Sequence, residues 1–160
     1  MRTHTNSQFD VIPSVAQAVQ ERDRNQCFIT GTLLPGDTDL VWMFPPTFYH
    51  LAGPTFSVFT QTVQIFVVSL SAAQGCKRIP EFFETASNAA FLHKDLIPFF
   101  LDNTFSVDVD DHHRVLVFRD MGPAQNLLPS HLQVTANHGL YDWYLREHFR
   151  ISLKVNLCDD

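Results

Sequence analysis

The spacing of hydrophobic residues predicts a helix near each end of the chain. Val15, Ala18 and Val19 recur at helical intervals after a proline, which predicts a helix of about three turns ending near Asn25. Toward the other end, apolar residues recur every four positions with charged residues between them: Leu145, Phe149, Leu153 and Leu157. This periodicity predicts an amphipathic C-terminal helix that docks on the rest of the fold.

Alternation of apolar and polar residues predicts strands between these helices. Thr104–Val109 and His113–Phe118 alternate on either side of a short polar segment, which indicates a β-hairpin half exposed to water. Cys27–Thr30 and Asp39–Phe44 are shorter β-prone segments, and we expect them to pair as a further hairpin with a longish loop. Two prolines should stop the second of these strands.

The part of the chain before the predicted hairpin at 104–118 is expected to be helical in two pieces. Pro80 is placed to start a short helix, and Asn88 then precedes an apolar-periodic run from Phe91 to Asn103. Pro98 lies inside this run and should end or kink the helix there, because proline lacks a backbone N–H. Helices and antiparallel strands together predict the α+β class.

The composition fits one folded domain. The chain has 160 residues, of which 45% are hydrophobic and 18% charged. This is enough for one core and too short for two ordinary domains. The formal net charge of −6 argues against an extended basic surface for nucleic acid. The cysteines are widely spaced, so no disulfide framework is predicted, and we expect an intracellular protein, cytoplasmic or nuclear.

One apolar run, Thr55–Ala73, is long enough to suggest a membrane span. Gln61, Gln64 and several hydroxyl side chains interrupt it. Burial against the domain core is therefore the favoured interpretation, and a membrane-associated protein is a more distant alternative.

Three segments, in this order and with this spacing, resemble the HNH endonuclease domains that are abundant in fungal proteomes: Glu21–Gly31, Asn88–Phe118 and Tyr144–Leu157. The resemblance implies one HNH nuclease-like domain over residues 1–160, with its core at about 14–157. Its expected centre is a ββα-metal unit, accompanied by an N-terminal helix, an additional β-hairpin and a C-terminal amphipathic helix. Residues 47–85 do not resemble the family and are interpreted as divergent or inserted.

The resemblance also implies positions for the catalytic residues. In the family, one histidine accepts a proton from the attacking water, an asparagine ties the loop in place, and a second histidine binds a divalent cation. The matching positions here are Trp42, Asn88 and Ile97, and only Asn88 is the family residue. An indole offers only an N–H donor and an aliphatic side chain offers no ligand. We therefore expect a nuclease-like domain with a degenerate active site, impaired catalysis and no bound cofactor.

An active, divalent-metal-dependent DNA endonuclease with non-standard ligands is the alternative. The candidate ligands for Mg²⁺, Mn²⁺ or Zn²⁺ lie near the replaced positions in the sequence: His50, His93, Asp95 and Asp102. However, one helical turn moves a side chain by about 5.4 Å, far more than a metal–ligand bond tolerates. DNA is a partner that only the resemblance implies, and no small-molecule substrate is indicated.

Overall fold

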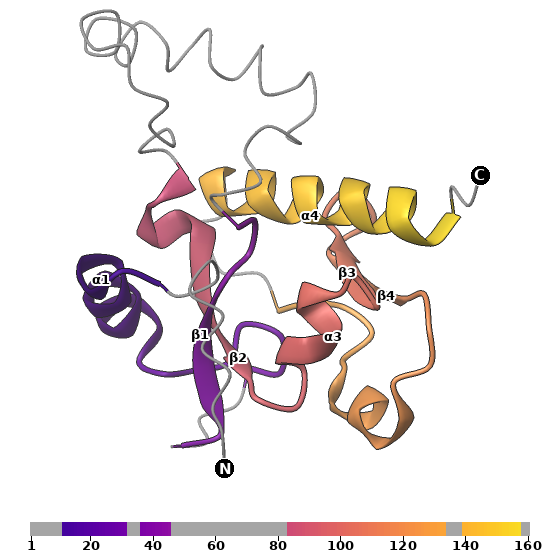
Figure 1. The fold of residues 1–160 in the computed structure, drawn as a ribbon, viewed down its shortest axis with the longest axis horizontal. Helices are drawn as coiled ribbons and strands as arrows, with labels where there is room; N and C mark the ends of the chain where they lie inside the picture. Colours follow the sequence, from indigo (N-terminus) through magenta and orange to yellow (C-terminus); the bar gives the residue numbers. More distant parts are fainter. Residues whose placement is uncertain (1–10, 32–35, 46–82, 134–138, 158–160) are drawn as a thin grey trace, which may run out of the picture.

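Figure 1 shows a computed structural model, which describes residues 11–31, 36–45, 83–133 and 139–157. Within these ranges the chain is a mixture of helices and strands, which agrees with the predicted α+β class. The α-helices are α1 (Pro13–Asp23), α3 (Ile97–Leu101) and α4 (Gly139–Leu157). The strands are β1 (Thr38–Trp42), β2 (Ala89–His93), β3 (Phe105–Asp108) and β4 (Arg114–Val117), and the 3₁₀ helices are η4 (Ala86–Asn88) and η5 (Gly122–Leu127).

The first sheet joins segments that are far apart in the sequence. β1 and β2 run antiparallel, with Thr38 opposite His93 at one end and Trp42 opposite Ala89 at the other. The predicted pairing of Asp39–Phe44 with Cys27–Thr30 is therefore wrong. Residues 27–30 belong to a turn beside β2, where the Phe28 N–H donates to the Phe91 carbonyl at 2.9 Å.

The predicted helix from Phe91 to Asn103 is wrong in its first part, because residues 91–93 belong to strand β2. This strand is buried on both faces. Ala89 and Phe91 face the hydrophobic cluster that contains α1, whereas Ala90 and Leu92 face the main core. A strand buried on both faces has no polar face, so its sequence loses the alternation that identifies strands. α3 begins only at Ile97 and has a proline in its first turn, where the missing N–H has no helical partner to lose.

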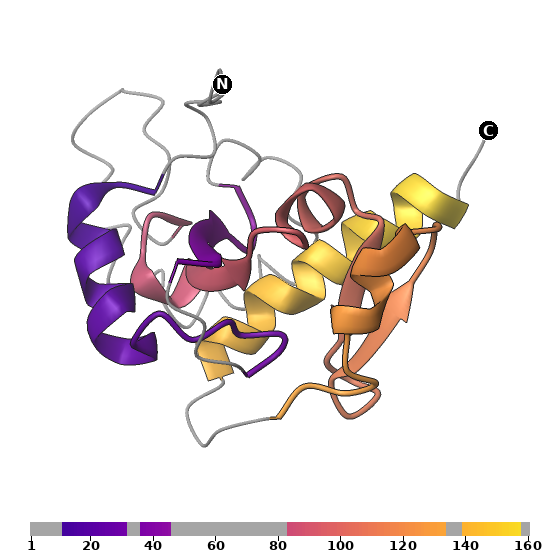
Figure 2. The same ribbon diagram turned by 90° about the horizontal axis from the view of Figure 1, so that it is seen from below.

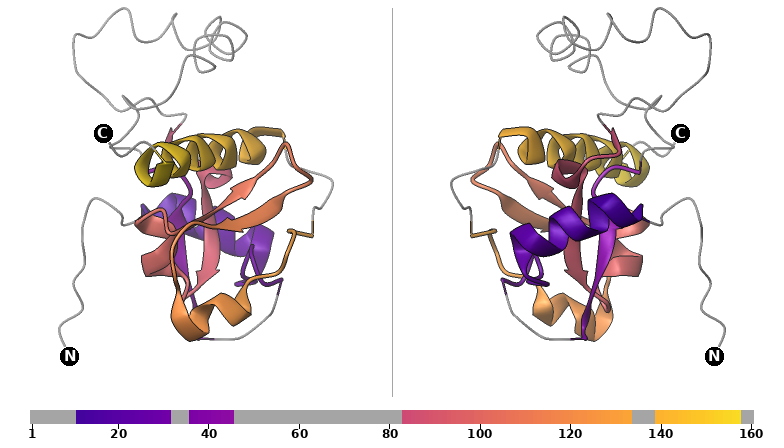
Figure 3. Two further views of the ribbon diagram at one scale, coloured as in Figure 1. Left: turned by 90° about the vertical axis from the view of Figure 1, so that its right-hand side faces the viewer. Right: turned by 90° about the vertical axis from the view of Figure 1, so that its left-hand side faces the viewer.

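Helix α1 covers one face of the β1–β2 sheet (Figure 3). It ends at Asp23, followed by Arg24 in the left-handed conformation with φ of 51°. Arg22 ties the helix to the sheet, because its guanidinium donates to the carbonyls of Ala86 at 2.6 Å and Ala89 at 2.8 Å. The prediction of an N-terminal helix is thus confirmed, with its end two residues before Asn25.

The second sheet is the predicted hairpin. β3 and β4 pair antiparallel, with Phe105 opposite Val117 and Asp108 opposite Arg114. Asp108 stabilises the turn, since its Oδ1 accepts from the N–H groups of the two residues at positions 110 and 111, at 3.1 and 3.3 Å. β4 is partly exposed, whereas Phe105, Ser106 and Val107 of β3 are all buried, so β3 is less exposed than its alternating sequence predicted.

Helix α4 runs along one side of the molecule, beside β3 and near η4 (Figures 1 and 2). The predicted C-terminal helix is confirmed, but its buried side is only partly as predicted. Leu145 is buried, whereas Leu157 is 68% exposed. The run Thr55–Ala73 lies outside the described residues, and no helix in the described part of the chain is long and apolar enough to cross a membrane.

Candidate functional site

Trp42, at the general-base position of the resemblance, is a core residue in this structure. It ends β1 and is 3% exposed. It packs in a cluster with Val15 and Val19 of α1 and with Ala89 and Phe91 of β2. The indole therefore contributes buried apolar area between α1 and the sheet, and it supplies no group that accepts a proton.

Asn88, at the asparagine position, is fully buried and fixes the end of β1. The Phe44 N–H donates to Asn88 Oδ1 at 2.9 Å, and Asn88 Nδ2 donates to the carbonyls of Phe44 and Phe83, both at 2.7 Å. Its backbone also takes part, because the Met43 N–H donates to the Asn88 carbonyl at 2.8 Å. One side chain thus supplies hydrogen-bond partners to three backbone groups that are not paired within the sheet.

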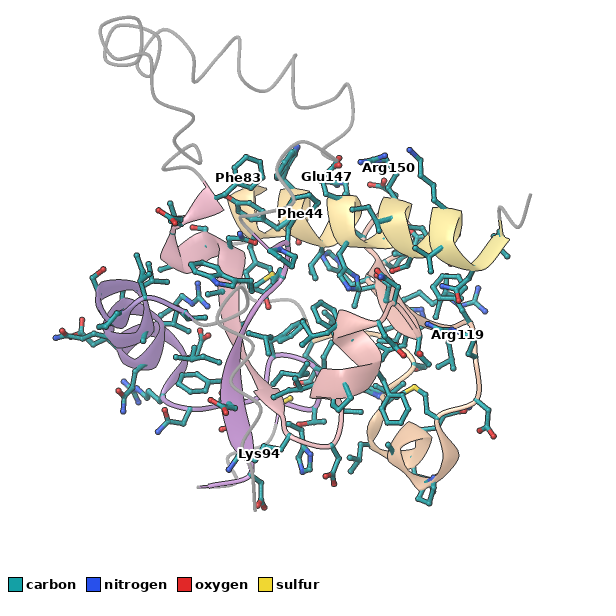
Figure 4. The ribbon with its side chains drawn as sticks, in the orientation of Figure 1. Phe44, Phe83, Lys94, Arg119, Glu147 and Arg150 are labelled. Atoms are coloured by element: carbon teal, nitrogen blue, oxygen red, sulfur yellow. The ribbon has the colours of Figure 1, made fainter. Side chains whose placement is uncertain are left out.

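The aromatic rings on either side of this asparagine also meet. Phe44 and Phe83 have centroids 5.6 Å apart and are buried against the first turns of α4 (Figure 4). The Asn88 hydrogen bonds therefore join β1 to the segment before β2, and the rings of Phe83 and of Trp143 and Tyr144 join that segment to α4.

Ile97, at the metal-ligand position, lies on the opposite side of the first sheet from the Trp42 cluster. It is the first residue of α3, is half-buried and packs against the main core. Trp42 belongs instead to the cluster on the α1 side. The structure therefore places the two positions of the expected catalytic pair in different hydrophobic clusters.

A small pocket adjoins the end of β1, between α3 and α4. Its lining comes from three segments of the chain: Trp42, Met43, Phe44 and Pro45; Phe100, Leu101 and Asn103; and His148 and Ile151. Asn88 and Ile97 are not among these residues. The lining contains no carboxylate, the ligand type that Mg²⁺ and Mn²⁺ prefer.

His148 of α4 is the titratable side chain in this lining, and both of its ring nitrogens are engaged. Nε2 lies 2.9 Å from the Phe100 carbonyl and Nδ1 lies 2.6 Å from Ser106 Oγ. A carbonyl can only accept, so Nε2 carries the proton and Nδ1 accepts from the Ser106 hydroxyl. Burial lowers the pKa of His148 to about 4, although the Phe100 carbonyl acts in the opposite direction. His148 is thus a neutral, hydrogen-bonded core residue.

The remaining candidate ligands are dispersed. His93 Nδ1 accepts from the Asp95 N–H at 3.3 Å and lies 3.9 Å from the Asp95 carboxylate, which is 73% exposed. Asp102 follows the other end of α3, where its Oδ1 accepts from the Thr104 N–H at 3.0 Å. His50 lies outside the described residues. The structure therefore brings His93 and Asp95 together and leaves Asp102 apart from them.

Among the described residues, no group of three or more His, Cys, Asp or Glu side chains could hold a metal ion. Acidic and imidazole side chains do meet in pairs, as in His113 and Asp142, where Nε2 and Oδ1 are 2.9 Å apart. That pair joins the hairpin turn to the start of α4. Two ligands of this kind fix a loop more readily than they fix a divalent cation, which needs several oxygen donors.

Sequence reasoning missed His148 and Ser106, the buried polar pair of this region. The available signal was the spacing in the C-terminal helix. His148 follows Leu145 by three positions and precedes Ser152 by four, so all three share one helical face. Only the apolar members of that helix entered the prediction of its buried side.

Comparisons with known proteins give this chain no relative: no family model, no curated protein and no solved structure matches it.

Proposed function

We propose that this protein is a catalytically inactive relative of the HNH endonucleases, kept as a structural or weak interaction domain. The observation that carries the proposal is the burial of Trp42 at the general-base position. Trp42 is 3% exposed and belongs to the hydrophobic cluster beside α1. A general base and a metal ion each contribute orders of magnitude to phosphodiester hydrolysis, so loss of both removes nearly all catalysis.

The order of elements supports the relation to a ββα-metal unit. β1 pairs antiparallel with β2, and α3 follows β2 in the chain. Asn88 stands immediately before β2, and its carboxamide ties the end of β1 to Phe83. This is the work that the resemblance assigns to the asparagine, and it continues without the neighbouring histidines because it is structural.

The charge distribution favours an inactive domain over a DNA-cleaving one. The basic side chains Lys94, Arg119 and Arg150 lie on separate parts of the molecule and form no patch around Phe44 at the end of β1 (Figure 4). Arg119 is paired with Asp102 at 3.5 Å and Arg150 with Glu147 at 2.9 Å. Arg146 lies one turn before Arg150 on α4, but it is paired with Asp110 at 2.9 Å, so carboxylates offset both cations of this pair. Phosphate binding favours cations gathered along one face without such partners.

The active alternative would depend on His93 and Asp95, the pair of candidate ligands that lie together. Asp95 is largely exposed and the pair is 3.9 Å apart, so any cation there would be held mainly by water. Among the described residues that line the pocket at the end of β1, the histidine is His148, whose two nitrogens are already bound, so it offers no free base.

The proposal is tested by incubating the purified full chain with supercoiled plasmid in Mg²⁺ or Mn²⁺. We expect the plasmid to stay supercoiled, while a metal-dependent nuclease run in parallel nicks it. Nicking that EDTA abolishes, and that is lost in His93→Ala or Asp95→Asn but kept in the exposed-site control Asn126→Ala, would establish the active alternative instead. Nicking that all variants share indicates a contaminant, and repeating the assay after further purification removes it.

A further inference from the structure

The two halves of α4 are held to the protein in different ways. In the first half, Trp143, Tyr144 and Leu145 are buried in the main core. In the second half, after His148, Ser152 is the one residue that is buried, and Val155 and Leu157 are 50% and 68% exposed. In the second half the apolar side chains are only partly buried: Ile151 packs against the main core, and the Phe149 and Phe118 ring centroids are 6.3 Å apart. Apolar burial therefore contributes more to the first half than to the second.

The second half of α4 also makes polar contacts with the segment after α3. Ser152 Oγ lies 3.0 Å from Asn103 Oδ1 and 2.8 Å from the His148 carbonyl, so its one hydrogen is shared between two acceptors. Asn156 Nδ2 donates to the Asn103 carbonyl at 2.8 Å. His148 stands at the start of this half and bonds Ser106 of β3 and the carbonyl of Phe100 in α3. Its ring also stacks on the Phe100 ring, with centroids 3.9 Å apart and planes within 4°. His148 is the titratable member of this set of contacts, and it is buried together with Ser106 and Ser152.

These contacts require the neutral imidazole. When the ring is protonated, both nitrogens must donate, but Nδ1 faces the Ser106 hydroxyl, which is its donor in the neutral state. Ser106 is fully buried, so turning its hydroxyl leaves that hydrogen without water to accept it. The charge itself would also be buried, at a position that is 6% exposed.

Among the described residues, no carboxylate bonds the His148 ring, whose two nitrogens face Ser106 and the Phe100 carbonyl. The carboxylates on the elements packed around the ring include Asp102 at the end of α3, Asp108 at the end of β3 and Glu147 beside His148 on α4. Asp102 is bound by Thr104 and paired with Arg119, and Glu147 is paired with Arg150. Burial and the Phe100 carbonyl are the influences on the pKa of His148, and no charged side chain contributes.

We propose that His148 is an acid-sensitive latch, whose protonation releases the second half of α4 from β3 and α3 while the first half stays in the core. The proposal rests on this geometry and is independent of any relation to nucleases.

The direction of the effect follows from linkage. The docked state holds the pKa of His148 at about 4, whereas a released, solvated histidine titrates near 6.5. Between these two values the released state binds more protons, so the latch is fully closed above about pH 6.5 and weakens as the pH falls toward 4. From pH 7 to pH 5, the ratio of released to docked molecules rises about twentyfold.

Amide hydrogen exchange, measured by NMR and converted to protection factors, tests the latch. Between pH 7 and pH 5 we expect protection of residues 149–157 to fall by about twentyfold, while amides in β2 and in Trp143–Leu145 keep theirs. His148→Gln retains one donor and one acceptor without titrating, so its protection of residues 149–157 should be the same at both pH values. Equal protection in the natural chain at both pH values overturns the proposal, as does a parallel loss in all elements, which would be global unfolding.

A second measurement uses only the natural chain, so it tests the proposal even if His148→Gln does not fold. The ring resonances of His148 in the natural chain, followed from pH 7.5 to pH 3.5, should titrate near pH 4. Titration near pH 6.5 with α4 still docked would show that the docked pocket tolerates the charge, and the latch would be refuted.

Discussion

Each of the two sheets in the described part of the molecule is joined to a neighbouring segment by one buried polar side chain, and the two side chains differ in chemistry. Asn88 holds the end of β1 through its carboxamide. His148 holds α4 to β3 and α3 through its imidazole. An amide makes the same hydrogen bonds at every pH, whereas an imidazole changes its donors and acceptors on protonation. The first connection is therefore permanent and the second depends on pH.

The largest effect is expected at the permanent connection. Asn88→Ala leaves the Phe44 N–H and the carbonyls of Phe44 and Phe83 buried without partners, which should lower the free energy of unfolding by about 4 kcal/mol. Urea denaturation at pH 7 measures it. The matched control is Asn126→Ala at an exposed position of η5, which should change stability by less than about 0.5 kcal/mol. A loss below about 1 kcal/mol for Asn88→Ala would mean that Asn88 is not a structural connection.

The next effect concerns the indole beside that connection. Trp42→His places the family's residue type at the general-base position but removes apolar volume from the cluster with Val15 and Val19. We expect it to lower the free energy of unfolding by about 3 kcal/mol and to produce no plasmid nicking, because the metal-ligand position stays aliphatic. Stability is measured by urea denaturation, and the nicking assay uses Mn²⁺. Metal-dependent cleavage by this variant would show that only the base was missing.

Removing the pH-dependent connection should lower the free energy of unfolding less at neutral pH than the two changes above. It should also remove a dependence of that free energy on pH. His148→Phe keeps a stacked ring but leaves Ser106 and the Phe100 carbonyl without partners, a loss of about 2 kcal/mol at pH 7. The natural chain should lose up to about 3 kcal/mol between pH 6.5 and pH 4 through this group, because its pKa in the folded state is about 4, and the variant should lose that dependence. If the free energy of unfolding changes with pH by the same amount in the natural chain and in the variant, His148 does not cause the pH dependence, and the two connections do not differ.

The smallest effect is expected in the second half of α4. Ser152→Ala removes the hydroxyl whose hydrogen is shared between Asn103 Oδ1 and the His148 carbonyl, and the half-buried Asn103 carboxamide can be hydrated in the variant. We expect a loss of about 1 kcal/mol, confined to the protection of residues 149–157 in hydrogen exchange. An equal loss of protection in α1 or β2 would show that the two regions do not act separately.

The sequence predicted the elements whose periodicity is clear. α1 and α4 each have a buried and an exposed side, and the two segments of the β3–β4 hairpin alternate apolar and polar residues around a turn, so the pattern of their residues identifies them. The alternation did not predict that Ser106 of β3 is buried. β2 was mistaken for a helix because the run from Ala89 to Leu92 is apolar on both faces. The partner of β1 was also missed, since strands distant in the chain leave no turn signal between them to reveal their pairing.

The candidate site could be predicted only as positions and not as an arrangement. The resemblance singled out Asn88, and the structure describes a buried carboxamide with three hydrogen bonds there. It also singled out Trp42 and Ile97, but a motif gives no information about which cluster receives each side chain. His148 was missed because a histidine on an amphipathic helix is polar by type, and its burial depends on contacts with β3 and α3 that lie far off in the sequence.

Our central proposal, that this domain binds no catalytic metal, is tested most directly by isothermal titration of Mg²⁺ and Mn²⁺ into the full natural chain. We predict no saturable heat and an unchanged melting temperature in either metal, because the lining of the pocket beside Trp42 offers no carboxylate. Saturable one-to-one binding that EDTA reverses, together with a higher melting temperature in the metal, would contradict the account.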